Sequence, residues 1–120
     1  MYCIEEGKGP VLVFIHGFPL THQMWKAQID FFKKSYRVIA PDLSGFGKSP
    51  MGKATTMQEF ADDLDKFLGE RAVNEPVTLV GFSMGGYISF PFYFAHPEKV
   101  RALVLCNTRA IADSAEVAAG

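Results

Sequence analysis

One serine of this chain has the residue type and the glycine spacing that nucleophilic catalysis uses. Ser83 stands in the pattern G-F-S-M-G at 81–85, after an apolar run at 77–80 that predicts a buried strand and before a stretch that predicts a helix. So sharp a turn forces the serine into strained backbone angles, and glycines two residues before and after it avoid a collision. The turn would expose the hydroxyl and put the next N–H at a helix start, where backbone donors favour an anion. The alternative is a glycine- and serine-rich loop without chemistry.

The rest of the chain alternates strands and helices around this turn. Mainly apolar runs at 11–15, 37–40, 77–80 and 100–105 predict about four buried strands. Their alternation with helical segments predicts an α/β fold, a parallel sheet with flanking helices. Residues 1–10 are polar, carry glycine and proline, and are interpreted as a fragment of an edge strand. The loops that follow the four strands are expected at one edge of the sheet, where such folds bind ligands.

The helical segments carry start signals and apolar faces. Thr21 is a candidate N-cap of the first helix, and T-M-Q-E at 56–59 is typical of a capping box that opens the second. Pro91 should kink the helix after Ser83, and most aromatic side chains of that helix are expected in the core. The apolar faces are Trp25, Ile29 and Phe32 in the first helix and Phe60, Leu64, Phe67 and Leu68 in the second, and the aromatic residues of the third are Tyr87, Phe90, Phe92, Tyr93 and Phe94.

Length and composition indicate one globular domain of a cytoplasmic protein. The chain has 120 residues, 48% of them hydrophobic, and a formal net charge of −1, which gives no reason to expect nucleic acid or an anionic membrane surface as a partner. Its first residues lack the basic and apolar regions of a signal peptide, and no apolar run approaches the length of a membrane span. Cys3 and Cys106 show no metal or redox spacing and are expected to stay reduced.

Three motifs, taken in order, resemble those of the α/β-hydrolase family. The likeness covers nearly all of residues 8–107 and is nearest to esterases, perhydrolases and cofactor-free haloperoxidases. The motifs are H-G-F-P at 16–19, P-D-L-S-G-F-G-K-S at 41–49 and G-F-S-M-G-G at 81–86.

The resemblance implies the α/β-hydrolase fold and a role for three residues. Ser83 matches the family's nucleophile, and Phe18 and Met84 match the residues whose backbone N–H groups form the oxyanion hole. A serine at this position argues against haloalkane dehalogenases and epoxide hydrolases, which use an aspartate there.

The chain departs from the family pattern in the loop at 41–49 and in the length of chain that follows the last predicted strand. Ser44 stands where the family usually has arginine, so a structural ion pair is expected to be missing. A serine nucleophile needs a base and an acid that orients it, and in this family both come later than residue 120. One subgroup of the family has its acid just after the strand that ends here at Leu105. The nearest residue to that position is Asn107, which is not an acid. Residues 1–120 are therefore expected to be the N-terminal part of one α/β-hydrolase domain without lid or C-terminal part, completed by a companion C-terminal fragment or a swapped copy.

None of the three histidines suits the role of the base. His16 belongs to the first motif and is expected to be a structural hydrogen-bonding residue. His22 is expected at the surface or as a cap of the first helix, although a position facing the pocket stays open. His96 should lie at the far end of the helix after Ser83, away from the active edge.

Two acidic residues and one loop motif are interpreted as structural. Asp42 is expected to be solvated or turn-forming rather than catalytic, and Asp113 has no evident partner. G-F-G-K-S at 45–49 resembles the end of a phosphate-binding loop, but that pattern needs glycine at position 42. Nucleotide binding is therefore not expected.

The functional hypothesis is a serine hydrolase of a small carboxylic ester or lactone that acts through an acyl-serine intermediate. Pocket walls near Phe18, Leu20, Trp25 and Met84 would favour apolar acyl groups, and no metal or organic cofactor is implied. Thioester, carbon–carbon bond and peracid chemistry stay open. The alternative is a non-catalytic truncated relative that acts as a binding or structural module.

Overall fold

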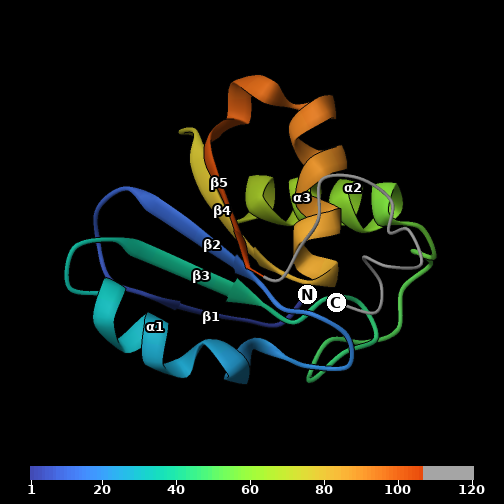
Figure 1. The fold of residues 1–120 in the computed structure, drawn as a ribbon, viewed down its shortest axis with the longest axis horizontal. Helices are drawn as coiled ribbons and strands as arrows, with labels where there is room; N and C mark the ends of the chain where they lie inside the picture. The colour runs from blue at the N-terminus through green and yellow to red at the C-terminus, as the bar shows by residue number, and fades with distance from the viewer. Residues whose placement is uncertain (107–120) are drawn as a thin grey trace, which may run out of the picture.

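The chain forms a single sheet with helices on both faces (Figure 1). This computed structural model describes residues 1–106, so Asn107, Asp113 and the rest of the tail lie outside the described residues. The strand order is β1-β3-β2-β4-β5. The elements are β1 (Cys3–Glu6), β2 (Val11–Ile15), η1 (His22–Trp25), α1 (Lys26–Phe32), β3 (Arg37–Pro41), α2 (Met57–Glu70), β4 (Val77–Phe82), α3 (Met84–Ala95), η2 (Pro97–Lys99) and β5 (Val100–Cys106).

The four predicted strands are all present as parallel neighbours, β3-β2-β4-β5, which confirms the α/β fold. Residues 3–6 form an edge strand, as the sequence indicates, and this strand, β1, pairs with β3 in the antiparallel direction. An antiparallel β1 ends at the edge where β2 begins, so the short segment 7–10 suffices to connect them. A parallel β1 would need a crossover of about a dozen residues.

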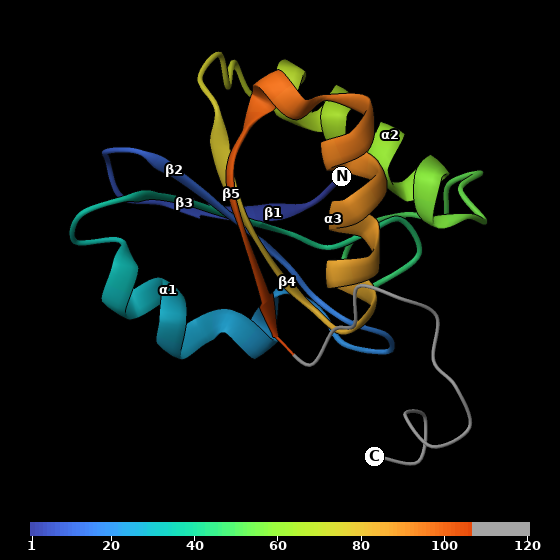
Figure 2. The ribbon, with the colours of Figure 1, turned by 45° about the horizontal axis from the view of Figure 1, so that its top comes forward.

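β2 illustrates why a continuous apolar run suits the centre of this sheet. All five of its residues are buried. Successive side chains point to opposite faces: Val13 and Ile15 join the core cluster under α2 and α3, whereas Leu12 and Phe14 join the one under α1. Figure 2 shows α1 on one face of the sheet and α2 and α3 on the other.

The predicted helix starts are confirmed. The Thr21 side chain accepts the backbone N–H of Gln23 at 3.2 Å, and Thr56 and Glu59 form a reciprocal capping box. Both predicted apolar faces lie against the sheet: Trp25, Ile29, Leu64, Phe67 and Leu68 are buried, and Phe32 and Phe60 are partly buried.

The prediction that most aromatic residues of α3 lie in the core is wrong for its C-terminal half. Phe92 is 1% exposed, whereas Tyr93 and Phe94 are 39% and 75% exposed. Three consecutive helical residues spread over roughly 200° of the helix circumference, so only one of them can face the sheet. α3 continues through Pro91 to Ala95.

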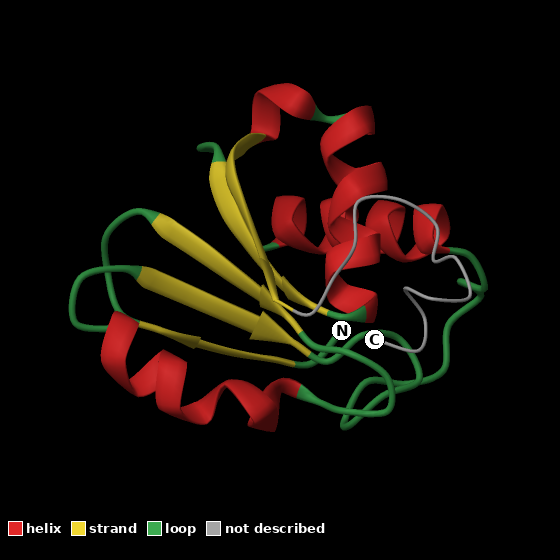
Figure 3. Cartoon of the chain, viewed as in Figure 1, coloured by secondary structure: helices red, strands yellow, loops and turns green. Residues whose placement is uncertain are grey.

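β5 ends the described sheet at the edge opposite β1 (Figure 3). Val104 and Leu105 are 45% and 36% exposed, and as neighbours in a strand they point to opposite faces. Among residues 1–106, the apolar side chains of this edge strand are therefore incompletely covered on both faces. Cys3 and Cys106 lie on β1 and β5, the two opposite edges of the sheet.

Candidate active site

Ser83 occupies the turn between β4 and α3, where the sequence predicts a nucleophile. Its φ of 52° and ψ of −110° are rare for a residue with a side chain, so the turn is strained at this position. The backbone N–H of Ser83 donates to the Cys106 carbonyl at 2.9 Å, and the Ser83 carbonyl accepts the N–H of Gly86 at 3.0 Å. The neighbouring strand and the first turn of α3 thus hold the strained residue in place.

Gly81 and Gly85 allow the backbone on either side of Ser83 to pack closely. A Cβ at Gly81 would lie 2.6 Å from the carbonyl carbon and oxygen of Gly85, and a Cβ at Gly85 would lie 2.1 Å from the carbonyl oxygen of Ile15. These neighbours are backbone atoms and cannot rotate away. The glycine spacing in the motif is therefore a packing requirement of this turn.

The loop at 16–22 follows β2 and turns back at Gly17. The Gly17 carbonyl oxygen accepts the N–H of Leu20 at 2.7 Å and lies 3.0 Å from Nδ1 of His16. The Phe18–Pro19 peptide bond is cis, but the Gly17–Phe18 bond is trans, so the Phe18 N–H points opposite to the Gly17 carbonyl. A Cβ at Gly17 would lie 3.0 Å from the carbonyl oxygen of Phe82, so the 16–22 loop runs beside the residue before Ser83.

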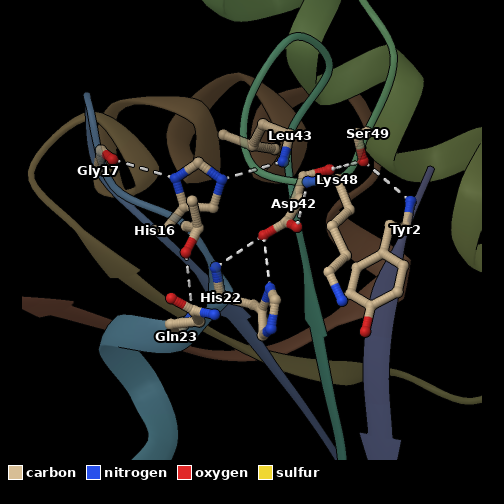
Figure 4. A network of polar contacts seen from close by, with 10 residues as sticks. Tyr2, His16, Gly17, His22, Gln23, Asp42, Leu43, Lys48 and Ser49 are labelled. Atoms are coloured by element: carbon tan, nitrogen blue, oxygen red, sulfur yellow. Dashed lines mark hydrogen bonds and ion pairs between the residues drawn. The ribbon is translucent and has the colours of Figure 1, made fainter.

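His16 is fully buried with both ring nitrogens engaged (Figure 4). The backbone N–H of Leu43 can only donate, so Nε2 accepts it at 3.0 Å and Nδ1 carries the proton, which it donates to the Gly17 carbonyl. Burial lowers the pKa of His16 below the ordinary histidine value, in keeping with a neutral ring. The prediction of a structural hydrogen-bonding residue is confirmed.

The expectations for His22 and Asp42 need correction. His22 is 9% exposed rather than at the surface, and Asp42 is fully buried rather than solvated. Asp42 Oδ1 accepts both the backbone N–H and the ring Nδ1–H of His22, each at 2.7 Å (Figure 4). The two residues are 20 positions apart and meet because β2 and β3 are parallel neighbours, a relationship that no local pattern reveals.

The loop after Asp42 wraps around that carboxylate, so Asp42 does form a turn as predicted. Oδ2 accepts the N–H of Lys48 at 2.9 Å, and a Cβ at Gly47 would lie 2.3 Å from the same oxygen. Burial opposes ionisation of Asp42, but the hydrogen bonds from His22 and Lys48 outweigh it and hold the pKa of the carboxyl below its ordinary value. The turn at 45–49, which resembles the end of a phosphate-binding loop, is therefore filled by the Asp42 carboxylate.

Ser44 makes a contact of its own with α2. Its hydroxyl donates to Oδ2 of Asp63 at 3.2 Å. A hydrogen bond thus joins the loop at 41–49 to α2 at the position where the family resemblance implies an ion pair.

The three remaining candidate residues are Met84, Trp25 and His96. Met84 is the first residue of α3, where N–H groups have no acceptor within the helix, as an oxyanion donor requires. Trp25 is 5% exposed and packs on Phe14 with ring centroids 4.9 Å apart, so the expectation that it forms a pocket wall is wrong. His96 follows the last residue of α3 and pairs with Asp65 at 3.4 Å, at the end of the helix away from the turn, as predicted.

Residues 1–106 show neither a metal-ligand cluster nor a membrane-spanning helix. No group of three or more histidine, cysteine, aspartate or glutamate side chains in this part of the chain is arranged to hold a metal ion. No helix in the same range is long and apolar enough to cross a bilayer. The chemical groups at the carboxyl edge of the sheet are a strained serine, backbone N–H groups of two turns and buried hydrogen-bonded pairs.

Comparisons with known proteins agree with this geometry. A family model described as the alpha/beta hydrolase fold matches residues 10–119. Epoxide hydrolase 2 of Siraitia grosvenorii is 35% identical over 108 residues, which cover 87% of this chain and 34% of that protein.

Two solved structures are similar over almost the whole chain. A thermophilic esterase from Thermogutta terrifontis superposes with a TM-score of 0.88 and 39% identity, covering 96% of this chain and 43% of that one. The N-acyl homoserine lactonase AidH superposes with a TM-score of 0.85 and 28% identity, covering 92% of this chain and 42% of that one. The chain thus spans less than half the length of these relatives.

Proposed function

Because the chain belongs to the alpha/beta hydrolase fold family, we propose that it supplies the nucleophile and the oxyanion hole of a serine hydrolase. The reaction is transfer of an acyl group from a small carboxylic ester or lactone to water through an acyl-serine intermediate. Since the chain spans 34% of one curated relative and 43% of one solved relative, the activity is assigned to the completed fold and not to these residues alone.

The conformation of Ser83 is the observation that carries this proposal. A residue with a side chain at φ 52° costs about 1–3 kcal/mol, and such strain is common where a side chain must be aimed at a substrate. The epoxide hydrolase to which this chain is similar suggests a different reaction, the hydrolysis of an epoxide. A serine at position 83, rather than an aspartate, favours acyl transfer.

The proposed reaction uses two backbone donors and one hydroxyl from this chain. Ser83 Oγ attacks the carbonyl carbon while its proton passes to a base. The carbonyl oxygen becomes an oxyanion and accepts the N–H groups of Phe18 and Met84, each worth about 2.7–4 kcal/mol of the barrier. The bond to the alcohol then breaks, and the base returns the proton to that leaving group. Water attacks the acyl-serine with help from the same base, which releases the acid and restores the hydroxyl.

The base and the acid that orients it must come from outside residues 1–106. His16 uses both ring nitrogens in buried hydrogen bonds, and the His22 ring packs against Tyr2, with ring centroids 5.3 Å apart, beside the β1 edge of the sheet and away from Ser83. His96 lies beyond the far end of α3. A histidine and an acid from the part that completes the fold therefore fill these roles in the proposed enzyme.

The exposed edge strand is the proposed attachment site of that completing part. Val104 and Leu105 present apolar surface on both faces of β5, and an edge strand offers unpaired backbone groups. A companion C-terminal polypeptide or a swapped copy of the chain would add strands next to β5 and cover these side chains.

The proposed substrate class follows from the similar proteins and from the 16–22 loop. An esterase and a lactonase are among the solved structures that this chain resembles. Phe18 and Leu20 are 70% and 38% exposed on the loop that holds one oxyanion donor. Exposed apolar side chains beside the reacting carbonyl favour a small apolar acyl group.

A fluorophosphonate probe tests the proposal, with intact-mass spectrometry as the readout. The chain, together with any polypeptide that copurifies with it, should gain one adduct, and Ser83→Ala should lose it. Ser35→Ala, a change at an exposed serine, should keep the adduct. A folded, completed protein that never reacts would exclude the hydrolase and favour the alternative, a non-catalytic binding or structural module.

A further inference from the structure

Two consecutive residues after β3 hold both ends of the 16–22 loop. At the start of the loop, the Leu43 N–H donates to Nε2 of His16 at 3.0 Å. At its end, Asp42 Oδ1 accepts the backbone N–H and the ring Nδ1–H of His22, each at 2.7 Å. Figure 4 shows both sets of hydrogen bonds meeting at this short segment.

Asp42 is itself fixed on its other sides, so it is a rigid anchor. Its backbone N–H donates to the Tyr2 carbonyl at 2.8 Å, and its carbonyl accepts the Ser49 hydroxyl at 2.5 Å. The second carboxylate oxygen accepts the Lys48 N–H at 2.9 Å. Because these partners come from the residue before β1 and from the loop after β3, the carboxylate cannot follow His22 if the 16–22 loop moves.

The middle of the 16–22 loop has little packing to fix it. Phe18 is 70% exposed and its ring meets Phe46 edge-on at 5.7 Å, while Leu20 is 38% exposed. A segment with few buried apolar contacts has low local stability, so hydrogen bonds at its ends decide its position.

We propose that His22, held by Asp42, is a positioning residue that fixes the Phe18 N–H where an oxyanion binds; this inference rests on the proposed function. His22 acts through the loop and does not touch the substrate. A histidine beside a carboxylate also resembles a base with its orienting acid. However, the His22 ring packs against Tyr2, which precedes β1, and two strands, β3 and β2, lie between β1 and β4, the strand that Ser83 follows.

A set of substitutions at His22 separates its hydrogen bond from its bulk. In His22→Asn, the amide nitrogen takes the place of Nδ1 and can still donate to Asp42, whereas His22→Leu fills the space without a donor. Hydrogen exchange of the amides of residues 17, 18, 20 and 21 should become about 10-fold faster in His22→Leu, the effect of one lost hydrogen bond, and should stay near the wild-type rate in His22→Asn. If the leucine variant does not fold, His22→Gln replaces it, because its amide lies one bond further from the backbone than Nδ1 of His22 and is displaced from the Asp42 carboxylate.

The catalytic readout is made on the completed protein with a small ester. His22→Leu should lower kcat roughly 10- to 100-fold with little change in KM, because a displaced oxyanion donor weakens the transition state and not substrate binding. His22→Asn should restore most of kcat. A purely structural role would lower the amount of folded enzyme without this difference between kcat and KM.

The outcomes distinguish this inference from the proposed function. Unchanged amide exchange in His22→Leu would overturn it, because the pair would not hold the loop. Faster exchange with unchanged kcat would also overturn it, since the loop would not need to be held for catalysis. If the wild-type protein does not react with fluorophosphonate, the proposed function fails, and with it the positioning role, while the exchange result still decides whether Asp42 holds the loop.

Discussion

Gly85 at the start of α3 lies directly against the carbonyl oxygen of Ile15 at the end of β2. A Cβ on Gly85 would stand 2.1 Å from that oxygen, so the two backbones touch with no side chain between them. The 16–22 loop begins at the next residue after Ile15, and Ser83 lies two residues before Gly85. Backbone contact therefore sets the spacing between the candidate nucleophile and the loop that carries one candidate oxyanion donor.

Gly85→Ala is expected to lower the free energy of unfolding by at least about 2 kcal/mol, because neither backbone can yield to the new methyl group. Urea denaturation followed by circular dichroism measures this change. Gly69→Ala is the matched control: nothing lies within 4 Å of its Cβ position in α2, and alanine there should stabilise by about 0.5–1 kcal/mol. Equal stability of Gly85→Ala and wild type would mean that the contact is not formed.

Ser83→Gly is expected to be about 1 kcal/mol more stable than Ser83→Ala, because glycine adopts φ 52° without the strain of a side chain. Part of the relief is lost to the greater freedom of glycine in the unfolded chain. Differential scanning calorimetry of the two variants gives the comparison, and both should lose the fluorophosphonate adduct. Identical unfolding temperatures would argue against strain at this turn.

The buried His16 should make stability fall as the pH drops below about 6.5. Its pKa is lowered by burial, so as the pH falls the unfolded chain takes up a proton before the folded chain does. Stability is thus complete above about pH 6.5 and declines toward the folded pKa, by at most about 1.4 kcal/mol per pH unit. Asp42 and Glu5 also have lowered pKa values, but their contributions are lost only below about pH 4.5.

Urea denaturation at a series of pH values measures this slope. His16→Asn should flatten it, because the variant has no imidazole to protonate. A slope that survives in His16→Asn would assign the pH dependence to another group.

Val104→Asp is expected to weaken association at the β5 edge while changing the free energy of unfolding of the chain only slightly. The side chain is 45% exposed on an edge strand, so it contributes more to a contact with a neighbour than to the core. If a swapped copy completes the sheet, light scattering after size exclusion, at rising protein concentration, should show less dimer than for wild type. Gln28→Asp, the same charge change at an exposed position of α1, should associate like wild type.

The strained turn could be predicted from the sequence because its requirements are local. A strand, a serine between two glycines and a helix start follow one another within a few residues, and the structure places Ser83 at φ 52° between β4 and α3. The capping box at Thr56 and Glu59 was predictable for the same reason. The roles of Ser83, Phe18 and Met84 in catalysis remain predictions.

The contact between His22 and Asp42 was not predictable, because it depends on which strands are neighbours. The sequence places each residue in a loop after a different strand, and nothing in either loop refers to the other. The direction of β1 and the exposure of Tyr93 and Phe94 depend in the same way on the assembled sheet.

The sequence by itself determined the alternation of strands and helices, the family and the position of the strained serine, since hydrophobic periodicity and glycine spacing act over a few residues. Only the tertiary structure decided that Asp42 lies between His22 and Lys48 and that His16 is neutral. Burial and hydrogen-bond partners determine the charge of a polar side chain, and both exist only once the parallel strands have brought distant loops to one edge of the sheet.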